Sequence, residues 1–135
     1  MIVDMTDSFT VSTVLPASAM RLYEAWLNGE EHSAFTGAAA VVDASVGGAF
    51  SAWDGYISGT TIAMDPSHRI LQAWRTTEFP PESPDSRLEI TFKEVEGGTR
   101  ITLIHSEIPD GQGQEYEQGW RDYYFKPMAI FFAAG

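Results

Sequence analysis

Cysteine is absent from this 135-residue chain, and its absence excludes disulfide bonds, thiol catalysis and cysteine-ligated zinc or iron–sulfur centres. Basic residues are also few, because 8 Lys and Arg stand against 19 Asp and Glu and leave a formal net charge of −11. A chain with that charge repels nucleic-acid phosphates and anionic lipid headgroups at long range. Binding to nucleic acids or to membrane surfaces is therefore disfavoured, and we expect no nucleic-acid partner.

Long hydrophobic runs and targeting signals are missing as well. The most apolar stretch, residues 128–134, is far shorter than the ~20 residues that span a bilayer. The first eight residues carry Asp4 and Asp7 and lack the basic and apolar regions of a signal peptide. These absences predict a cytoplasmic protein without membrane insertion, with residues 1–7 as a loose N-terminal segment.

The residues that are present are typical of a globular protein. The composition is 44% hydrophobic, 13% aromatic and 20% charged, which argues against intrinsic disorder. A chain of this length supports one core that buries roughly two-thirds of the surface of the unfolded chain. We therefore expect a single domain over residues 1–135.

The N-terminal part predicts a strand followed by two short helices. Residues 9–13 alternate between apolar and polar side chains, as a half-buried strand does. Over 17–27 the apolar residues recur at spacings of three and four, and Pro16 suits the first turn of that helix. Asn28-Gly29 is expected to end it. A second short helix then follows and closes near Gly37.

The middle of the chain is rich in strand-forming residues and is punctuated by turns. Asp54-Gly55 lies between Trp53 and Tyr56, and two such residues between aromatic strand residues indicate a tight hairpin. The remaining strands are expected over 40–43, 49–53, 56–64, 69–77, 88–93 and 99–106, with Gly59 interrupting one of them and Gly47-Gly48 and Gly97-Gly98 at bends or turns.

A long helix is predicted from about Gln114 to the C-terminus. Large apolar residues recur there at spacings of three and four, which is the pattern of one buried helix face. They are Tyr116, Trp120, Tyr123, Tyr124, Met128 and Phe131. Pro127 lies inside this helix and removes one backbone hydrogen bond, so we expect a kink near Tyr123.

Together these elements predict an α+β domain in which the terminal helix covers one face of an antiparallel sheet. A single helix is ~10 Å wide, which is narrower than a sheet of about seven strands spaced ~4.8 Å apart. If the sheet curls around the helix, a gap remains between the two, roofed by the short helices. The sequence therefore predicts an internal cavity.

An ordered series of motifs runs through nearly the whole chain. It consists of Trp26, Phe35-Thr36-Gly37, Val46-Gly47-Gly48-Ala49-Phe50, Trp53-Asp54-Gly55-Tyr56-Ile57-Ser58-Gly59, Trp74-Arg75, Phe79-Pro80, Thr99, His105, Ile108-Pro109, Gly119-Trp120 and Tyr123-Tyr124. The series resembles the single-domain bacterial homologues of the activator of heat-shock-protein-90 ATPase, within the START-like, or SRPBCC, superfamily. The resemblance implies a helix-grip fold, as in birch-pollen-allergen-like proteins, with a ligand cavity between a curved sheet and the long helix. It also implies a chaperone as a candidate partner.

Two polar side chains are candidates for the cavity. Strand alternation places His105 on the same face as Leu103, where it either contacts a ligand or is a buried, neutral, hydrogen-bonded histidine. Arg75 follows Trp74 on a strand, so the two point to opposite faces. An inward Arg75 would suit a ligand carboxylate, and an outward one would pair with a surface acid.

The aromatic residues supply the remaining site candidates, since they combine apolar rings with hydroxyl or indole donors. The full set of expected ligand-binding residues is Trp53, Tyr56, Trp74, Arg75, Phe92, Leu103, His105, Trp120, Tyr123 and Tyr124. We expect no metal or cofactor, because His32, His68 and His105 are far apart in sequence and no phosphate-binding loop or nucleophile elbow is present.

Three functions remain open. The first is a binding module for a small apolar or amphipathic molecule with a carboxylate or carbonyl group. The second is an enzyme of the cyclase, dehydratase or hydrolase type, in which Arg75 holds the substrate and His105 or Tyr123 acts as general acid or base. The third is a co-chaperone-like protein whose acidic surface meets a basic patch on a heat-shock ATPase. Either a monomer or a homodimer is compatible with all three.

Overall fold

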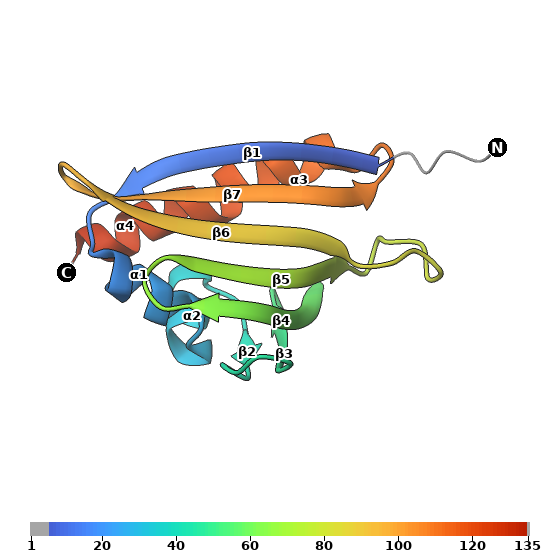
Figure 1. Ribbon diagram of the computed structural model, residues 1–135, viewed down its shortest axis with the longest axis horizontal. Coiled ribbons are helices and arrows are strands. Elements are labelled where there is room, and N and C mark those ends of the chain that lie inside the picture. Colours follow the sequence, from blue (N-terminus) through green and yellow to red (C-terminus); the bar gives the residue numbers. More distant parts are fainter. Residues whose placement is uncertain (1–5, 135) are drawn as a thin grey trace.

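The computed structural model describes residues 6–134 and consists of one antiparallel sheet with helices against one face (Figure 1). The elements in chain order are β1 (Thr6–Leu15), α1 (Ala19–Trp26), α2 (Gly29–Thr36), β2 (Val41–Val42), β3 (Ala49–Ala52), β4 (Ile57–Asp65), β5 (Arg69–Thr76), β6 (Ser86–Val95), β7 (Gly98–Pro109), α3 (Gly113–Trp120), η1 (Arg121–Phe125) and α4 (Lys126–Ala133). The predicted α+β, helix-grip architecture is confirmed.

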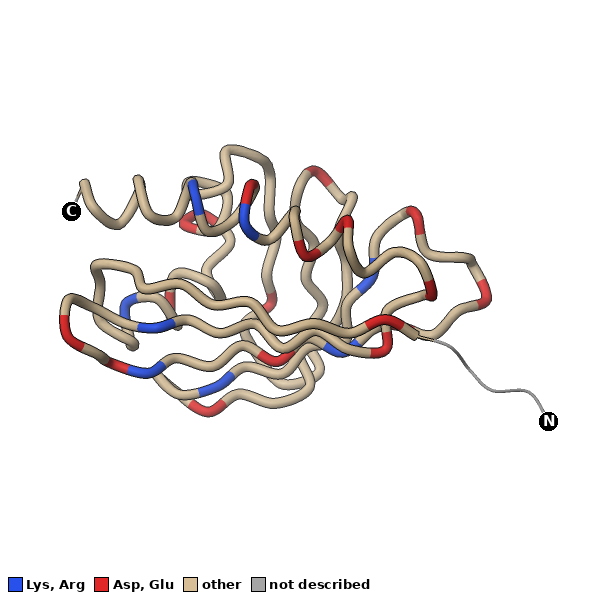
Figure 2. Tube along the Cα trace, turned by 90° about the horizontal axis from the view of Figure 1, so that it is seen from above, with Lys and Arg blue, Asp and Glu red and all other residues tan. Residues whose placement is uncertain are grey.

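The sheet has seven strands in the order β1-β7-β6-β5-β4-β3-β2, and all neighbouring strands are antiparallel. Figure 2 shows the C-terminal helical segment running along one face of the sheet as a separate layer. The short helices α1 and α2 lie beside the end of that segment that carries the C-terminus (Figure 1). No helix within residues 6–134 combines the length and the apolar character needed to cross a membrane.

The core lies between the sheet and the helices. On β6 and β7 the predicted inward residues are buried, with Ile90 opposite Leu103 and Leu88 opposite His105 in the strand register. On α1 the predicted apolar face is likewise buried, including Leu22 and Trp26. Strand and helix periodicity therefore identified the faces that meet in the core.

The terminal helix is continuous but changes its winding in the middle. Residues 121–125 form a π-helical turn, in which the backbone N–H of Lys126 bonds to the carbonyl of Arg121. Pro127 has no N–H to give to the carbonyl of Tyr123, so the regular pattern of bonds fails at this point. The irregularity predicted near Tyr123 is thus present, as a widened turn.

Both short helices have polar N-caps. Helix α1 begins at Ala19, two residues later than predicted, because the Ser18 side chain accepts a hydrogen bond from the N–H of Arg21. The Asn28 side chain accepts from the N–H of Glu31, so Asn28 caps the start of α2. The prediction that Asn28-Gly29 is only a stop signal is therefore incomplete, since the pair also begins the next helix.

The start of the chain corrects another prediction. Thr6 and Asp7 belong to β1, and one Asp7 carboxylate oxygen accepts hydrogen bonds from the N–H groups of Gly111 and Gly113, at 3.0 and 2.8 Å. A carboxylate at the N-terminus of α3 satisfies unpaired donors of that helix. The predicted loose segment is therefore wrong for residues 6 and 7, and residues 1–5 lie outside the described residues.

The β3–β4 connection is longer than predicted. Ala52 pairs with Ile57, so Trp53 and Tyr56 lie in a four-residue turn and not in the flanking strands. Trp53 and Asp54 adopt positive φ angles of 52° and 58°. The turn projects two aromatic side chains from the edge of the sheet toward the terminal helix.

Gly59 does not interrupt β4, in contrast to the prediction. The strand continues through it, and the register shifts between Thr61 and Ala63 instead. A Cβ atom at Gly59 would lie 1.9 Å from the carbonyl oxygen of Ala73 and 2.8 Å from the Phe50 ring. The glycine is therefore required for close packing of neighbouring strands.

Candidate functional site

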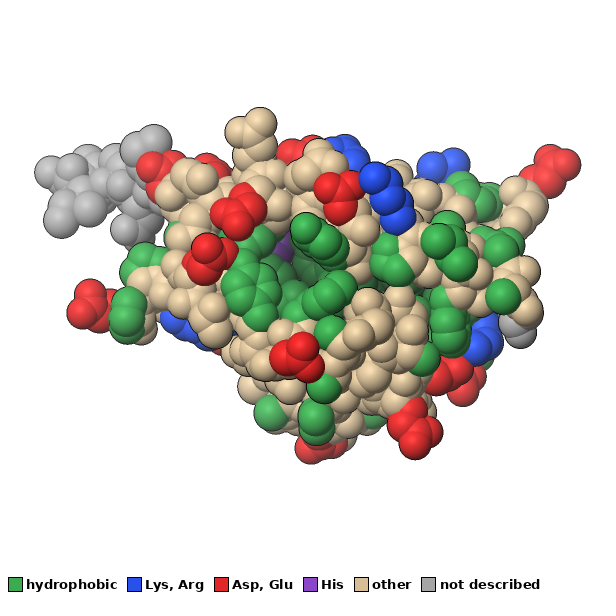
Figure 3. Space-filling view, turned by 180° about the vertical axis from the view of Figure 1, so that it is seen from behind, with side chains coloured by type: hydrophobic (Ala, Val, Ile, Leu, Met, Phe, Trp, Pro, Cys, Tyr) green, Lys and Arg blue, Asp and Glu red, His purple; other side chains and the backbone are tan. Residues whose placement is uncertain are grey.

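A cavity of about 300 Å³ lies between the terminal helix and the β3–β5 part of the sheet. Its lining residues are Trp53, Tyr56, Ile57, Trp74, Tyr116, Gly119, Trp120, Tyr123 and Tyr124. Figure 3 shows the opening as a hollow among hydrophobic side chains, with acidic side chains on several sides. The volume is at the lower end of the range of small-molecule sites, which begins at about 300 Å³.

The β3–β4 turn and the π-helical turn form the mouth of the cavity. The rings of Trp53 and Tyr123 meet edge to face, with centroids 5.7 Å apart and planes at 71°. Tyr123 is 60% exposed, so it forms part of the rim. Tyr124, the next residue in the widened turn, is buried. The β3–β4 turn is longer than predicted and the π-helical turn replaces a predicted kink, and these two turns carry the rim residues.

The inner wall consists of aromatic rings in mutual contact. Trp74 on β5 contacts Tyr116 and Trp120 on α3, with ring centroids 5.1 and 5.6 Å apart. Gly119 leaves space beside them, because a Cβ atom there would have its nearest neighbour, an atom of the Tyr123 ring, at 3.9 Å. Part of the cavity therefore depends on the absence of a side chain at position 119.

His105 lies behind this wall and is fully buried. Trp120 donates its indole N–H to Nδ1 of His105 at 3.1 Å, and an indole nitrogen can only donate. Nδ1 is therefore unprotonated, and Nε2 carries the proton and donates to the Ser86 hydroxyl at 2.8 Å. Ser86 in turn donates to the carbonyl of Trp74 at 2.8 Å. Burial lowers the pKa of His105 to about 3.

Of the two interpretations of His105, the structure thus shows the buried, neutral, hydrogen-bonded one. Both ring nitrogens are engaged inside the protein, and the residue does not line the cavity. Its contacts hold Trp120 on the helix and the backbone of Trp74 on the sheet. His105 therefore supports the aromatic wall of the cavity from behind.

A second buried histidine supports the site from the other side. The Tyr124 hydroxyl bonds to Nε2 of His32 at 2.8 Å, while Nδ1 of His32 lies 2.9 Å from the carbonyl of Trp26. A carbonyl only accepts, so Nδ1 carries the proton and Tyr124 is the donor to Nε2. Burial lowers the pKa of His32 to about 4 and raises that of Tyr124. The sequence showed no signal for this pair, whose members are 92 residues apart.

Two other tyrosine hydroxyls of the lining, those of Tyr116 and Tyr56, are also paired. Tyr116 donates to Oε1 of Gln112 at 2.7 Å and lies 2.7 Å from the hydroxyl of Thr76. Tyr56 donates to the carboxylate of Glu78, and burial together with that carboxylate raises the pKa of Tyr56. The cavity walls are therefore almost wholly apolar, because most of their polar atoms face partners in the protein.

Arg75 points away from the cavity. Its guanidinium donates to the Asp85 carboxylate at 2.8 Å and to the carbonyls of Ser83 and Pro80 at 3.1 and 3.3 Å. The same group lies over the Phe79 ring, 5.4 Å from its centroid. The inward alternative is therefore wrong, because the loop after β5 supplies every partner that the guanidinium needs. Arg75 therefore holds the loop after β5 in place through these hydrogen bonds.

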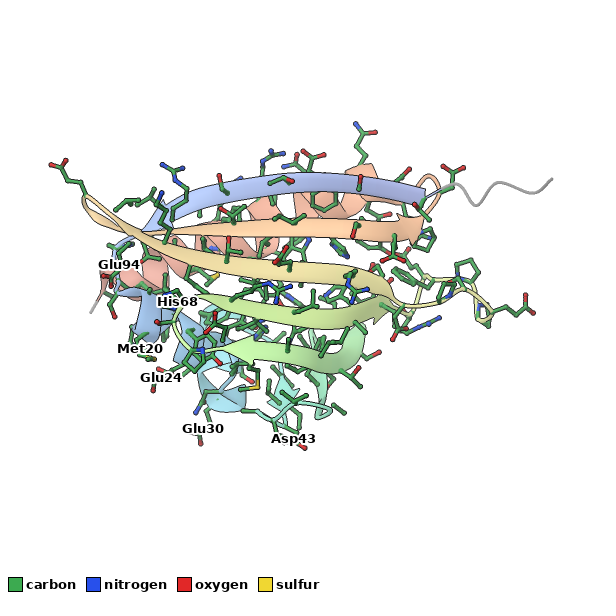
Figure 4. All side chains as sticks on the ribbon, in the orientation of Figure 1. Met20, Glu24, Glu30, Asp43, His68 and Glu94 are labelled. Carbon is green, nitrogen blue, oxygen red and sulfur yellow. The ribbon has the colours of Figure 1, made fainter. Side chains whose placement is uncertain are left out.

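Phe92 and Leu103 were predicted in the binding set and lie elsewhere. Leu103 is fully buried, and Phe92 borders a second hollow at the other end of the sheet, near Met20, His68 and Glu94 (Figure 4). Both residues lie on the predicted face of the sheet. Leu103 is two positions from His105 along β7, and Phe92 is four positions from Leu88 along β6. Alternation specifies a face and not a position along it.

Six of the ten predicted binding residues line the cavity: Trp53, Tyr56, Trp74, Trp120, Tyr123 and Tyr124. Three lining residues were missed, namely Ile57, Tyr116 and Gly119. Helical spacing offered a signal for two of them, since Tyr116 and Gly119 each precede a predicted residue by four positions. The part of the chain that the structure describes contains no cluster of three or more His, Cys, Asp or Glu side chains suited to a metal ion.

Comparison with known proteins agrees with this architecture. Residues 16–133 match the family model described as "Activator of Hsp90 ATPase homolog 1-like protein". The chain belongs to this family. Human "Activator of 90 kDa heat shock protein ATPase homolog 1" is 30% identical over 130 residues, which are 96% of this chain and 38% of the human protein. A Dictyostelium discoideum homologue is 27% identical over 118 residues, 86% of this chain and 30% of that protein. The chain thus spans well under half the length of these relatives.

Solved structures with this fold come from diverse sources. An HSP90 activator from Plasmodium falciparum superposes with a TM-score of 0.84 at 23% identity, covering 93% of this chain and 96% of that chain. The Ara h 8.0201 structure gives a TM-score of 0.74 at 14% identity, with 97% and 100% of the two chains covered. These structural similarities establish that the chain has the helix-grip fold.

Proposed function

We propose that this protein is a binding module for a small, largely aromatic molecule. The observation that carries the proposal is the aromatic cavity of about 300 Å³ between the terminal helix and the sheet. Aromatic rings on several sides favour a flat apolar ligand, because stacked and edge-to-face contacts add to the burial of apolar surface. The paired hydroxyls of Tyr56, Tyr116 and Tyr124 leave few polar groups for a ligand.

Filling the cavity from position 119 tests this proposal. Gly119→Leu places a side chain in the space beside Trp120, whereas Ala129→Leu adds the same side chain at an exposed position of the same helical segment. Binding of flavonoid, polyketide-type and fatty-acid probes is followed by tryptophan fluorescence and native mass spectrometry. We expect Gly119→Leu to weaken binding at least about tenfold and Ala129→Leu to leave it unchanged. Equal binding by both variants, or no probe bound by the parent chain, would contradict the proposal.

The enzymatic alternative depended on the convergence of three side chains. Arg75 faces the loop after β5, His105 has both nitrogens engaged behind the wall, and Tyr123 lies at the exposed rim. A general acid or base must reach the substrate within hydrogen-bonding distance. The arrangement therefore gives no support to catalysis by these three residues.

A second candidate function is interaction with a heat-shock chaperone. Its support is the family membership and the 30% identity to the human ATPase activator homologue over nearly the whole chain. The net charge of −11 would favour a basic patch on such a partner. The test is the ATPase rate of a purified 90 kDa heat-shock protein with and without this chain. Stimulation that disappears at high salt supports this function, and an unchanged rate contradicts it.

A further inference from the structure

We propose that the cavity selects organic cations, such as quaternary or aromatic ammonium compounds, over neutral and anionic molecules of the same shape. This inference rests on the proposed function, because it specifies the class of ligand for the same cavity. Three features carry it: the aromatic faces of the walls, two carboxylates at one end, and the orientation of the nearby basic side chains.

Several aromatic rings surround one small volume. Trp53, Trp74 and Trp120 all line the cavity, and Tyr123 completes the mouth. The face of an aromatic ring is electronegative, and tryptophan attracts a cation most strongly. When a cation enters a cavity enclosed by several aromatic rings, its attraction to the rings compensates for the loss of its hydrating water. An anion in the same place meets no basic side chain among the lining residues.

Two carboxylates lie near one end of the cavity. Glu78 accepts the hydroxyl hydrogen of Tyr56, which is itself a lining residue. Glu115 lies on α3 directly before the lining residue Tyr116. Burial raises the pKa of Tyr116, and the charges of Glu78 and Glu115 raise it further. Neither acid forms an ion pair with any residue of the described range 6–134. Their charge is therefore available to attract a cation.

The basic side chains near the site are engaged with other acids. Arg75 pairs with Asp85 on the outer surface at 2.8 Å. On the terminal helix, Lys126 pairs with Asp122 at 3.0 Å, and Arg121 lies 3.4 Å from Glu117. None of the three lines the cavity. A ligand carboxylate, as the sequence suggested, therefore has no counter-charge among the lining residues. A cation instead meets the carboxylates of Glu78 and Glu115, which lie next to the lining residues Tyr56 and Tyr116.

Three probes of similar shape and different charge provide the test. They are benzyltrimethylammonium, its neutral carbon analogue neopentylbenzene, and the anion 4-tert-butylbenzoate. Each is titrated into the protein at low salt, and binding is followed by the change in tryptophan fluorescence. We expect the cation to bind about tenfold more tightly than the neutral analogue and the anion to bind most weakly. Added salt should weaken only the cation. Equal or tighter binding of the neutral probe would overturn the selectivity while leaving the cavity proposal intact. Failure of all three probes, and of the wider panel, would contradict both.

Matched variants locate the effect. Glu78→Gln combined with Glu115→Gln removes both charges and keeps similar shapes, and Glu96→Gln removes one exposed acid from the β6–β7 turn as the control. We expect the double variant to lose cation affinity about fivefold, with neutral binding unchanged. Trp53→Leu keeps an apolar side chain but removes one ring face, so it should also weaken the cation selectively. Equal losses for the cation and the neutral probe would show that these residues only shape the cavity, and would overturn the proposal.

Discussion

The indole N–H of Trp120 donates to Nδ1 of His105 at 3.1 Å, so the cavity wall on the helix is tied to the sheet by a fully buried histidine. The other nitrogen of His105 reaches Ser86, and Ser86 reaches the backbone of Trp74. One chain of hydrogen bonds thus links both sides of the aromatic wall. Each member has a partner, which is the condition under which a buried polar network stabilises a fold.

Replacing His105 with Leu should therefore destabilise the protein strongly. The change leaves the buried Trp120 indole N–H without a partner, which costs about 1–3 kcal/mol. It also removes the donor to the Ser86 hydroxyl, which keeps its bond to the Trp74 carbonyl. We expect the free energy of unfolding in urea to fall by about 2–4 kcal/mol. His68→Gln changes an exposed histidine and should stay within about 0.5 kcal/mol of the parent. Similar stability of the two variants would contradict the assigned network.

The two buried histidines should make the protein sensitive to acid. Burial lowers the pKa of His105 to about 3 and the pKa of His32 to about 4 in the folded state, against 6.5 for a free histidine. Between about pH 4 and 6.5 the two histidines of the unfolded chain bind up to two more protons than those of the folded chain. Stability is therefore complete above about pH 6.5 and falls by up to about 2.7 kcal/mol per pH unit as the pH decreases through that window.

Urea unfolding at several pH values checks this dependence. Because the carboxylates also titrate at the lower end of the window, the informative quantity is the difference between the parent and His32→Gln. The variant has one buried histidine fewer, so its slope should be smaller by about 1.4 kcal/mol per pH unit. Parallel curves would mean that His32 is protonated in the folded state, contrary to its bond with the Tyr124 hydroxyl.

Two glycines should respond oppositely to alanine. At Gly119 the added Cβ meets its nearest neighbour at 3.9 Å, so Gly119→Ala should stabilise the helix by up to about 1 kcal/mol. At Gly59 the Cβ would lie 1.9 Å from a backbone oxygen of β5, so Gly59→Ala must displace strands and destabilise by at least about 1–3 kcal/mol. Thermal and urea unfolding measure both. A stabilising Gly59→Ala would contradict the close approach of β4 and β5.

Arg75 should matter for the loop after β5 and not for binding. Arg75→Ala removes the donor to Asp85, Ser83 and Pro80, which should cost about 1 kcal/mol and increase proteolytic cleavage within residues 77–85. Asp85→Ala should increase cleavage in the same loop. The affinity of both variants for a cavity probe should stay within about twofold of the parent. A large loss of affinity in Arg75→Ala alone would place its guanidinium at the ligand.

Much of the fold follows from local patterns. The alternation over β6 and β7 and the three-and-four spacing on α1 identified the faces that became buried, since each period maps directly onto one side of an element. On the terminal helix the same spacing was wrong for Tyr123, which is 60% exposed, and Phe131 is only partly buried. Pro127 indicated where the helix departs from regular winding. Six of the seven aromatic residues that line the cavity were also identifiable, because large rings next to a wide sheet meet the same space.

The amino-acid sequence by itself therefore determined the order of elements, the buried faces and the aromatic character of the site. Only the tertiary structure decided which tyrosine meets His32, which indole meets His105, and that Arg75 turns outward to a loop ten residues away. The physical reason is that periodicity describes one element at a time, whereas a hydrogen bond between distant residues depends on how elements are positioned along and across each other. The same limit explains why Phe92 and Leu103 share the predicted face but not the cavity.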